Sequence, residues 1–247
     1  MRPILAVLAA IALLAGCGTN QAGQPKALIV FAAASLTEAF EKIAPGFERD
    51  NPDVKVRYNF GGSSALAQQI NQGAPADVFA AASPATMKTV TDAGNGDAVA
   101  STFARNQLAI AVPPNNPKGI KGLADLARPG LKVALCAEQV PCGAAAKTVL
   151  AAAGVKLTPV TLEQDVKAAL AKVRLGEADA ALVYRTDIRS LSDVEGVEFP
   201  ESAKAINDYP IVVVKNAPNK AAAQAFVAYV TAGPGKTVLA EFGFQTA

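Results

Sequence analysis

Residues 27–50, with the sequence ALIVFAAASLTEAFEKIAPGFERD, contain a short apolar run followed by a longer amphipathic one. The first five residues are continuously apolar, which is typical of a buried strand. The second half predicts a helix over 36–50, because its large apolar residues recur at helical spacing: Leu36, Phe40, Ile43 and Phe47. This segment therefore predicts a strand that leads directly into a helix, the unit from which α/β proteins are built.

The same alternation continues along the chain. Strands are predicted over residues 54–60, 77–82, 106–112, 131–135, 178–184 and 209–215. Helices are predicted over residues 64–71, 84–94, 123–127, 143–153, 161–175, 219–231 and 234–242. Such alternation predicts an α/β fold with parallel sheets covered by helices on both faces.

Composition excludes several classes of function. The chain has 247 residues, with 23 Lys and Arg against 21 Asp and Glu, and no histidine. The balanced charge argues against a nucleic-acid partner, since neutralising phosphates needs clustered cations. The missing imidazole excludes Ser-His-Asp and Cys-His catalysis and the commonest zinc sites. A hydrolase using Ser35 or Ser63 stays a separate hypothesis, but neither serine has a lysine base at Ser-x-x-Lys spacing.

The N-terminus has the features of an export signal. Arg2 precedes an apolar run over residues 4–15, which is too short to span a membrane and long enough for a signal peptide. The run ends in Leu14-Ala15-Gly16-Cys17, which resembles a lipobox whose cysteine is lipidated. We therefore predict a lipoprotein signal peptide over 1–17, a tether over 18–26 and a protein that is lipid-anchored outside the cell membrane or periplasmic. The alternative is an ordinary signal peptide that contains an unrelated cysteine.

Export bears on the two remaining cysteines, Cys136 and Cys142. Outside the cytoplasm, two thiols this close in the chain tend to form a disulfide. The alternative is a pair of buried, unreactive thiols. A metal site would need further ligands, and there is no histidine to supply them.

Four strand–helix junctions carry small and polar residues suited to a ligand site. They are 31–38 (FAAASLTE), 60–64 (FGGSS), 140–143 (VPCG) and 163–166 (EQDV). Ligands in α/β proteins bind near such junctions, and free N–H groups at helix N-termini favour anions. Ser35 and Glu38 match a capping box, and Thr161 is the predicted cap of the helix over 161–175. Taken singly, each junction is also consistent with an ordinary helix cap or turn.

In combination, these motifs resemble those of periplasmic molybdate-binding proteins of ABC transporters. The resemblance rests on 31–37 (FAAASLT), 61–64 (GGSS), 73–79 (GAPADVF), 140–143 (VPCG), 165–166 (DV) and 182–184 (LVY). Their order and spacing hold to the closing 242–244 (FGF).

The resemblance implies a two-lobe periplasmic binding protein (type II) fold with the ligand between two α/β lobes joined by hinge strands. Lobe 1 is then expected over 27–105 plus 209–247, and lobe 2 over 106–208. By motif, the oxyanion contacts fall on Ser35, Ser63, Cys142, Val166 and Tyr184. The family usually has alanine where Cys142 stands, a change that preserves the backbone donor.

The implied function is binding of molybdate, and of tungstate, for delivery to an ABC permease. Molybdenum would then be bound only as its oxyanion, with no direct protein ligand to the metal, no cofactor and no catalysis, by a protein expected to be a monomer. None of the four junctions carries Lys or Arg, so neutral donors and helix dipoles would hold the dianion. The alternative is the same scaffold binding another tetrahedral oxyanion, such as sulfate.

Overall fold

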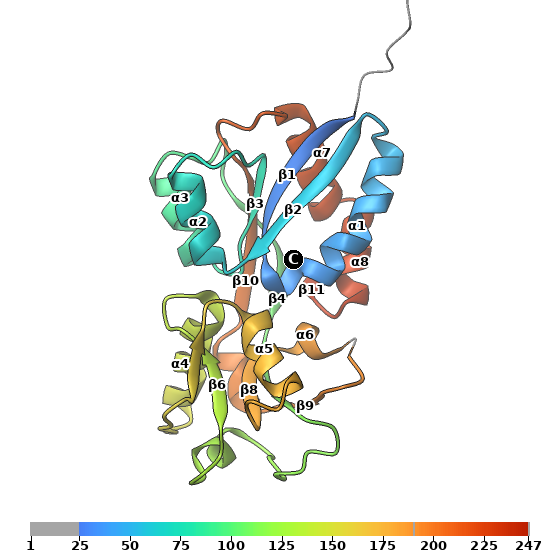
Figure 1. The fold of residues 1–247 in the computed structure, drawn as a ribbon. Coiled ribbons are helices and arrows are strands. Elements are labelled where there is room, and N and C mark those ends of the chain that lie inside the picture. Colours follow the sequence, from blue (N-terminus) through green and yellow to red (C-terminus); the bar gives the residue numbers. More distant parts are fainter. Residues whose placement is uncertain (1–24, 190, 247) are drawn as a thin grey trace, which may run out of the picture.

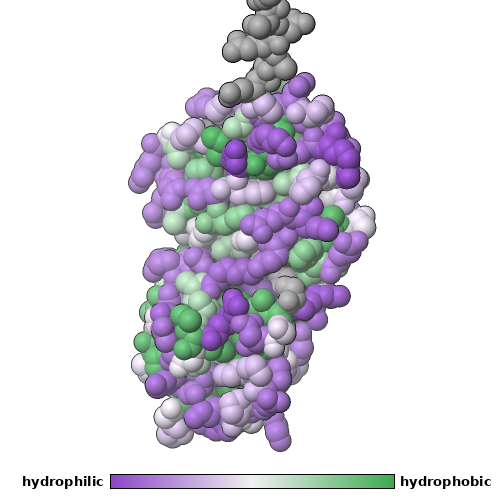
Figure 2. Space-filling view, turned by 45° about the vertical axis from the view of Figure 1, so that its right-hand side comes forward, coloured by the Kyte–Doolittle hydropathy of each residue, from purple (hydrophilic) through white to green (hydrophobic). Residues whose placement is uncertain are grey.

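Two lobes stacked end to end make up the protein in a computed structural model that describes residues 25–189 and 191–246 (Figure 1). In the space-filling view the lobes meet at a narrowed waist (Figure 2). The predicted signal peptide, Cys17 and all but the last two residues of the predicted tether lie outside the described residues. Within the described ranges, no helix is both long enough and apolar enough to cross a membrane.

Lobe 1 is built on a mixed sheet with the strand order β11-β4-β10-β3-β1-β2. Its strands are β1 (Lys26–Ala33), β2 (Val54–Gly61), β3 (Val78–Ala80), β4 (Ser101–Asn106), β10 (Asn207–Val213) and β11 (Gln245–Thr246). Its helices are the 3₁₀-helix η1 (Ala34–Leu36), α1 (Thr37–Asp50), α2 (Ser63–Asn71), α3 (Pro84–Asp92), α7 (Lys220–Thr231) and α8 (Pro234–Glu241).

Helices cover both faces of this sheet (Figure 1). On one face, α1, α7 and α8 enclose an aromatic core, in which the ring of Phe226 lies 5.9 Å from that of Phe40 and 5.2 Å from that of Phe47. The helical spacing of Phe40 and Phe47 explains why α1 forms here, because burying that face removes large apolar side chains from water. On the other face, α2 and α3 cover a smaller cluster around Phe79.

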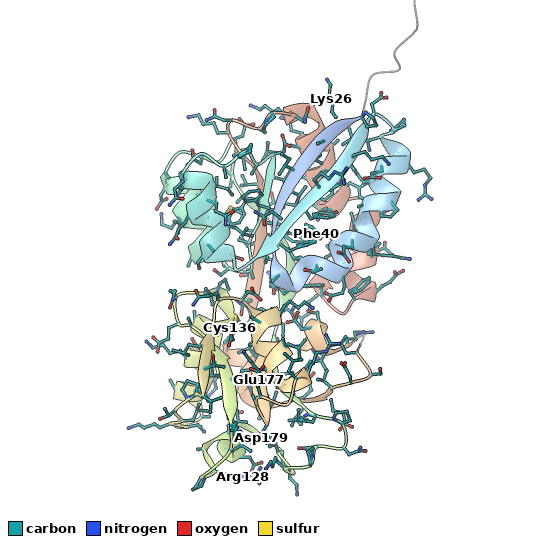
Figure 3. The ribbon with its side chains drawn as sticks, in the orientation of Figure 1. Lys26, Phe40, Arg128, Cys136, Glu177 and Asp179 are labelled. Carbon is teal, nitrogen blue, oxygen red and sulfur yellow. A yellow bond between two sulfur atoms is a disulfide. The ribbon has the colours of Figure 1, made fainter. Side chains whose placement is uncertain are left out.

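Lobe 2 is built on a second mixed sheet with the strand order β7-β6-β8-β5-β9. Its strands are β5 (Leu108–Val112), β6 (Val133–Cys136), β7 (Thr161–Glu163), β8 (Ala180–Tyr184) and β9 (Glu195–Val197). Its helices are η2 (Leu123–Ala127), α4 (Pro141–Ala152), α5 (Val166–Arg174), α6 (Arg185–Arg189) and η3 (Pro200–Lys204). Cys136, at the end of β6, lies on the side facing lobe 1, and Asp179 and Arg128 lie toward the opposite end (Figure 3).

The α/β class is confirmed, but the prediction of parallel sheets is wrong in part. In lobe 1, β1 pairs in parallel with β2 and β3, whereas β10 runs antiparallel to β3 and β4. In lobe 2, β6 is parallel to β7 and β8, whereas β5 is antiparallel to β8 and β9. The antiparallel strands β4, β5 and β10 adjoin the segments where the chain crosses between the lobes, which a strand–helix alternation does not anticipate.

The chain passes from the first sheet to the second between β4 and β5, and returns between β9 and β10. The carboxyl ends of β1 and β6 face one another across the boundary between the lobes (Figures 1 and 3). The lobe limits expected after Arg105 and Asp208 stay predictions of where one rigid body gives way to the other.

Candidate functional site

A small cavity lies between the lobes and is lined by residues from both of them. Its volume is about 20 Å³. Its lining consists of Ala33, Ala34, Ser35, Gly61, Gly62, Ser63 and Ala82 from lobe 1 and Val140, Pro141, Cys142, Asp165, Val166 and Tyr184 from lobe 2. The structure thus brings together every residue that the sequence predicted for the ligand site.

The N-termini of three helices open onto this cavity. Ser63 is the first residue of α2, Cys142 the second of α4 and Val166 the first of α5. Backbone N–H groups in the first turn of a helix have no acceptor within the helix, and the helix dipole adds partial positive charge there. The arrangement therefore presents backbone donors from both lobes to one small volume, which suits an anion.

The N-terminus of α5 differs from the prediction of a helix capped by Thr161. Residues 161–163 instead form β7, which extends the sheet beside β6. Asp165 is the actual cap, since its Oδ1 accepts a hydrogen bond from the N–H of Ala168 at 2.9 Å. This cap holds the start of α5 at Val166 and leaves the N–H of that residue at the mouth of the helix.

The predicted capping box of Ser35 and Glu38 does not form. Residues 34–36 make a turn of 3₁₀-helix, and α1 begins at Thr37 without a side-chain cap. The Ser35 hydroxyl is instead hydrogen-bonded to the Tyr209 hydroxyl at 2.9 Å, and Glu38 pairs with Lys167 of lobe 2 at 2.7 Å. Ser35 therefore lines the cavity, and the Glu38 side chain reaches across to lobe 2, instead of capping their own helix.

Three hydroxyl groups at the cavity are positioned to donate. The Ser63 Oγ accepts a hydrogen bond from the N–H of Ala82 at 3.0 Å, which directs its own proton elsewhere. The buried Tyr184 hydroxyl has no hydrogen-bond partner among the described residues. Burial raises the pKa of Tyr184 and of Tyr209 well above the usual range, so both phenols keep their protons at neutral pH. Tyr209 can then donate to Ser35, which frees the Ser35 proton for a ligand.

Among the described residues, no Lys or Arg side chain lines the cavity. The cation next in sequence to the lining residues, Lys167, has its ammonium group 2.7 Å from Glu38 and 3.1 Å from Asp187. Burial raises the pKa of the Asp187 carboxyl to about 6, although Lys167 and the N–H of Tyr184 act in the opposite direction. Lys167 is thus compensated by carboxylates, and the attraction for an anion comes from dipoles and neutral donors.

A disulfide joins Cys136 to Cys142, with an S–S distance of 2.10 Å and a Cα–Cα distance of 5.7 Å. It closes the loop between β6 and α4 directly beside the cavity. Gly143 packs so tightly here that a Cβ atom would overlap the carbonyl group of Ala137. The backbone N–H of Cys142 is therefore presented by a loop that is constrained both covalently and sterically.

The lobes are in close contact around the cavity. A Cβ atom on Gly62 of lobe 1 would overlap the backbone carbonyl oxygen of Gln164 of lobe 2. On the same side, the Ser64 hydroxyl donates to the carbonyl oxygen of Gln139 at 2.7 Å. These contacts define a closed arrangement of the lobes.

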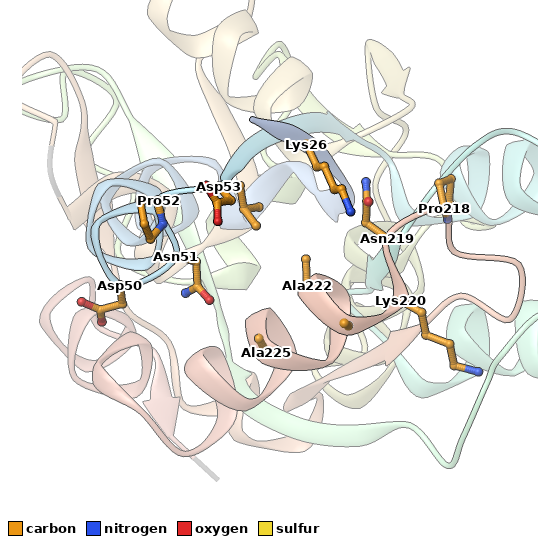
Figure 4. Close-up of a pocket in the computed structure, with 12 residues that line it drawn as sticks. Lys26, Asp50, Asn51, Pro52, Asp53, Pro218, Asn219, Lys220, Ala222 and Ala225 are labelled. Carbon is orange, nitrogen blue, oxygen red and sulfur yellow. The ribbon is translucent and has the colours of Figure 1, made fainter. Parts of the chain in front are cut away.

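A larger hollow, of about 790 Å³, lies at the opposite end of lobe 1, where β1 begins (Figure 4). Its walls include Lys26, Asp53 and Asn219, and alanines of α7 lie beneath them. These charges have opposite signs, and among the described residues only one helix, α7, has its N-terminus at this hollow, whereas three helix N-termini meet at the smaller cavity. We therefore place the candidate site at the smaller cavity. Among the described residues, no group of three or more His, Cys, Asp or Glu side chains could hold a metal ion.

Sequence reasoning missed several contacts that support the site. Asp165 carried a usable signal, because Asp just before an amphipathic helix is a favoured cap. Tyr209 carried none, since its partner Ser35 lies 174 positions away. The same holds for Lys167 and Glu38, 129 positions apart, and for the approach of Gly62 to Gln164.

Two α/β lobes with a small, anion-favouring cavity between them define a solute-binding protein. A family model described as "Bacterial extracellular solute-binding protein" matches residues 28–245, and the chain belongs to this family. The molybdate-binding protein ModA of Mycobacterium tuberculosis is 44% identical over 243 residues, covering 95% of this chain and 93% of the relative.

Solved structures agree on the fold. The periplasmic molybdate-binding protein of Azotobacter vinelandii superposes with a TM-score of 0.75 at 21% identity, covering 88% of this chain and 98% of that one. A structure described as the tungstate ABC transporter from Geobacter sulfurreducens gives a TM-score of 0.71 at 19% identity, covering 89% of this chain and 100% of that one. The two-lobe binding-protein fold expected from the sequence is thereby confirmed.

Proposed function

We propose that this protein binds molybdate, and tungstate, outside the cytoplasmic membrane and delivers the oxyanion to an ABC permease. One observation carries the proposal: helix N-termini and neutral hydroxyls of both lobes enclose a cavity that no Lys or Arg side chain of the described residues lines. The similarity to a molybdate-binding protein over nearly the whole chain supports it independently.

The ligand contacts follow from the donors available. Backbone N–H groups would come from Ser35, Ser63, Cys142 and Val166, and hydroxyl protons from Ser35, Ser63 and Tyr184. Each hydrogen bond to a charged group contributes about 1.5–3 kcal/mol. Several such contacts, less the cost of ordering and closing the lobes, are sufficient for micromolar or tighter binding.

The same donors provide selectivity. A site made only of donors accepts a fully ionised oxyanion but leaves the O–H of a protonated one without an acceptor. Phosphate, which is partly protonated near pH 7, should therefore bind poorly. Sulfate has the right charge but is smaller, so it cannot reach donors of both lobes at once. Tungstate is nearly the size of molybdate and should bind comparably.

The described residues do not favour hydrolysis. The Ser35 hydroxyl contacts Tyr209, and the Ser63 oxygen accepts from a backbone N–H, so neither is hydrogen-bonded to a basic side chain within the described ranges. We further propose that Cys17 carries a lipid, that the mature chain acts as a monomer and that it needs no cofactor.

Titration calorimetry on the mature protein tests the proposal with molybdate, tungstate, sulfate and phosphate. We expect one site, tight for the first two anions and undetectable for the others at submillimolar concentration. Sulfate binding as tight as molybdate binding would assign the site to a different oxyanion, and ester hydrolysis abolished by Ser35→Ala would assign it to an enzyme.

A further inference from the structure

Lys167 occupies a position that its own helix does not favour. It is the second residue of α5, where the positive end of the helix dipole opposes a cation. Its ammonium group lies instead between two carboxylates, 2.7 Å from Oε1 of Glu38 and 3.1 Å from Oδ1 of Asp187. The side chain is 26% exposed, so both contacts are partly shielded from solvent. The placement of Lys167 is therefore accounted for by its carboxylate partners rather than by helix stability.

The two carboxylates belong to different lobes. Asp187 lies in α6 of lobe 2, is fully buried, and accepts the backbone N–H of Tyr184 on its other oxygen at 3.1 Å. Glu38 lies in the first turn of α1 in lobe 1. The contact with Asp187 is internal to lobe 2, so of these two ion pairs only the one between Lys167 and Glu38 spans the boundary between the lobes.

This interlobe ion pair (Lys167 with Glu38) adjoins the anion site on both sides. Val166, which offers its N–H to the cavity, directly precedes Lys167, and Ser35 lies three residues before Glu38. The pair forms only when α1 and α5 approach one another. It consequently stabilises the closed arrangement and leaves the separated lobes unaffected.

We infer that Lys167 and Glu38 are positioning residues whose ion pair holds the lobes closed over the bound oxyanion and slows its release. The inference rests on the proposed function and adds a determinant of residence time to it. An interaction present in only one of two states shifts their equilibrium by its own free energy. Because the pair is absent before closure, it acts on dissociation and not on the initial encounter.

A purely electrostatic role for Glu38 predicts the opposite effect of its neutralisation on molybdate affinity. Glu38 and Asp187 place two carboxylates near the cavity against the one ammonium of Lys167. If Glu38 acted only through its charge, neutralising it would strengthen the binding of a dianion. If it holds the lobes together, neutralising it weakens binding.

The experiment compares Glu38→Gln with Glu41→Gln in the full mature chain loaded with molybdate. Glu41 is an exposed residue of the same helix and has no ion-pair partner within the described ranges, so its variant removes the same charge without the interlobe contact. Release of radiolabelled molybdate into excess unlabelled molybdate gives the dissociation rate. We expect Glu38→Gln to release molybdate about two- to fivefold faster at low salt, as for a partly exposed pair, and Glu41→Gln to match the unaltered protein.

A double-mutant cycle separates the pair from other effects of either residue. Once Lys167→Gln is present, adding Glu38→Gln should not accelerate release further. In high salt, the difference between Glu38→Gln and the unaltered protein should shrink. Equal or slower release from Glu38→Gln, or additive effects in the double variant, would overturn the inference while leaving the anion site intact. Failure of the unaltered protein to bind molybdate would instead refute the proposed function, and this inference with it.

Discussion

The Tyr184 hydroxyl permits a test in which ligand affinity and protein stability respond differently. Tyr184 is buried at the end of β8, and its hydroxyl lines the cavity without a partner among the described residues. Tyr184→Phe removes only that oxygen and keeps the ring that packs against Tyr209, with centroids 5.9 Å apart. If the hydroxyl donates to the dianion, its loss costs a charge-assisted hydrogen bond of about 1.5–3 kcal/mol, or a roughly tenfold to hundredfold rise in Kd.

The stability of the unliganded protein should not fall with the loss of the Tyr184 hydroxyl, in contrast to its molybdate affinity. Since no protein group loses a partner, Tyr184→Phe should leave the free energy of unfolding unchanged or raise it by up to about 1 kcal/mol. Tyr209→Phe is the matched control, because it removes the same atom from a neighbouring buried ring. Its hydroxyl is bonded to Ser35, so its removal leaves the Ser35 hydroxyl buried without that partner and should cost about 1–3 kcal/mol of stability.

Calorimetric titration with molybdate and urea unfolding of both variants supply the two measurements. The expected pattern is weak binding with unimpaired stability for Tyr184→Phe, and impaired stability for Tyr209→Phe. Unchanged molybdate affinity in Tyr184→Phe would remove Tyr184 from the site. A stability loss in Tyr184→Phe as large as that in Tyr209→Phe would show that its hydroxyl has a structural partner.

Three further predictions concern closure, the disulfide and a buried carboxyl. Gly62→Ala should raise the Kd for molybdate by at least about tenfold, because the new Cβ meets the carbonyl oxygen of Gln164; unaltered affinity with unaltered Tm would show that binding does not need this approach. Reducing the Cys136–Cys142 disulfide should lower the free energy of unfolding by about 2–3 kcal/mol in urea titrations, and identical curves with and without reductant would contradict this. The raised pKa of Asp187, about 6 against 3.8, means that the folded state retains this proton longer than the unfolded chain. The stability of the unaltered protein relative to Asp187→Asn should therefore fall as pH rises from about 4 to above 6, by about 3 kcal/mol in total, whereas a pH-independent difference would contradict the shift.

The sequence was sufficient to predict features that depend on local patterns. The apolar spacing of Phe40 and Phe47 predicted α1, and the serines after Gly61-Gly62 predicted the start of α2 to within one residue. Local patterns failed where a distant partner decides the structure. Ser35 and Glu38 have the spacing of a capping box, but Tyr209 and Lys167 bind their side chains instead. Thr161 is a good helix cap by type, yet pairing with β6 draws it into a strand.

The motifs that carry the site residues are local in the chain: Ser35, Ser63, Cys142 and Val166 lie at helix starts, and Tyr184 lies at the end of a strand. Their convergence is not local, since it requires β1 and β6 to direct their carboxyl ends toward one another from separate sheets. No spacing in the chain encodes this, and only the resemblance to a known family implied it. The contacts between the lobes, such as that of Lys167 with Glu38, were missed for the same reason.

The division of donors between the lobes explains how an anion can drive closure without a countercharge. Lobe 1 supplies Ser35 and Ser63, and lobe 2 supplies Cys142, Val166 and Tyr184, so neither lobe alone surrounds a ligand. An anion on one lobe retains water on its other side, and closure replaces that water with the donors of the second lobe. Because those donors are already oriented by their helices, the disulfide and the buried phenols, little reorganisation opposes the exchange. Without the anion, closing the lobes would bring partial positive charges together, so a full dianion stabilises the closed state more than a neutral molecule of the same shape could.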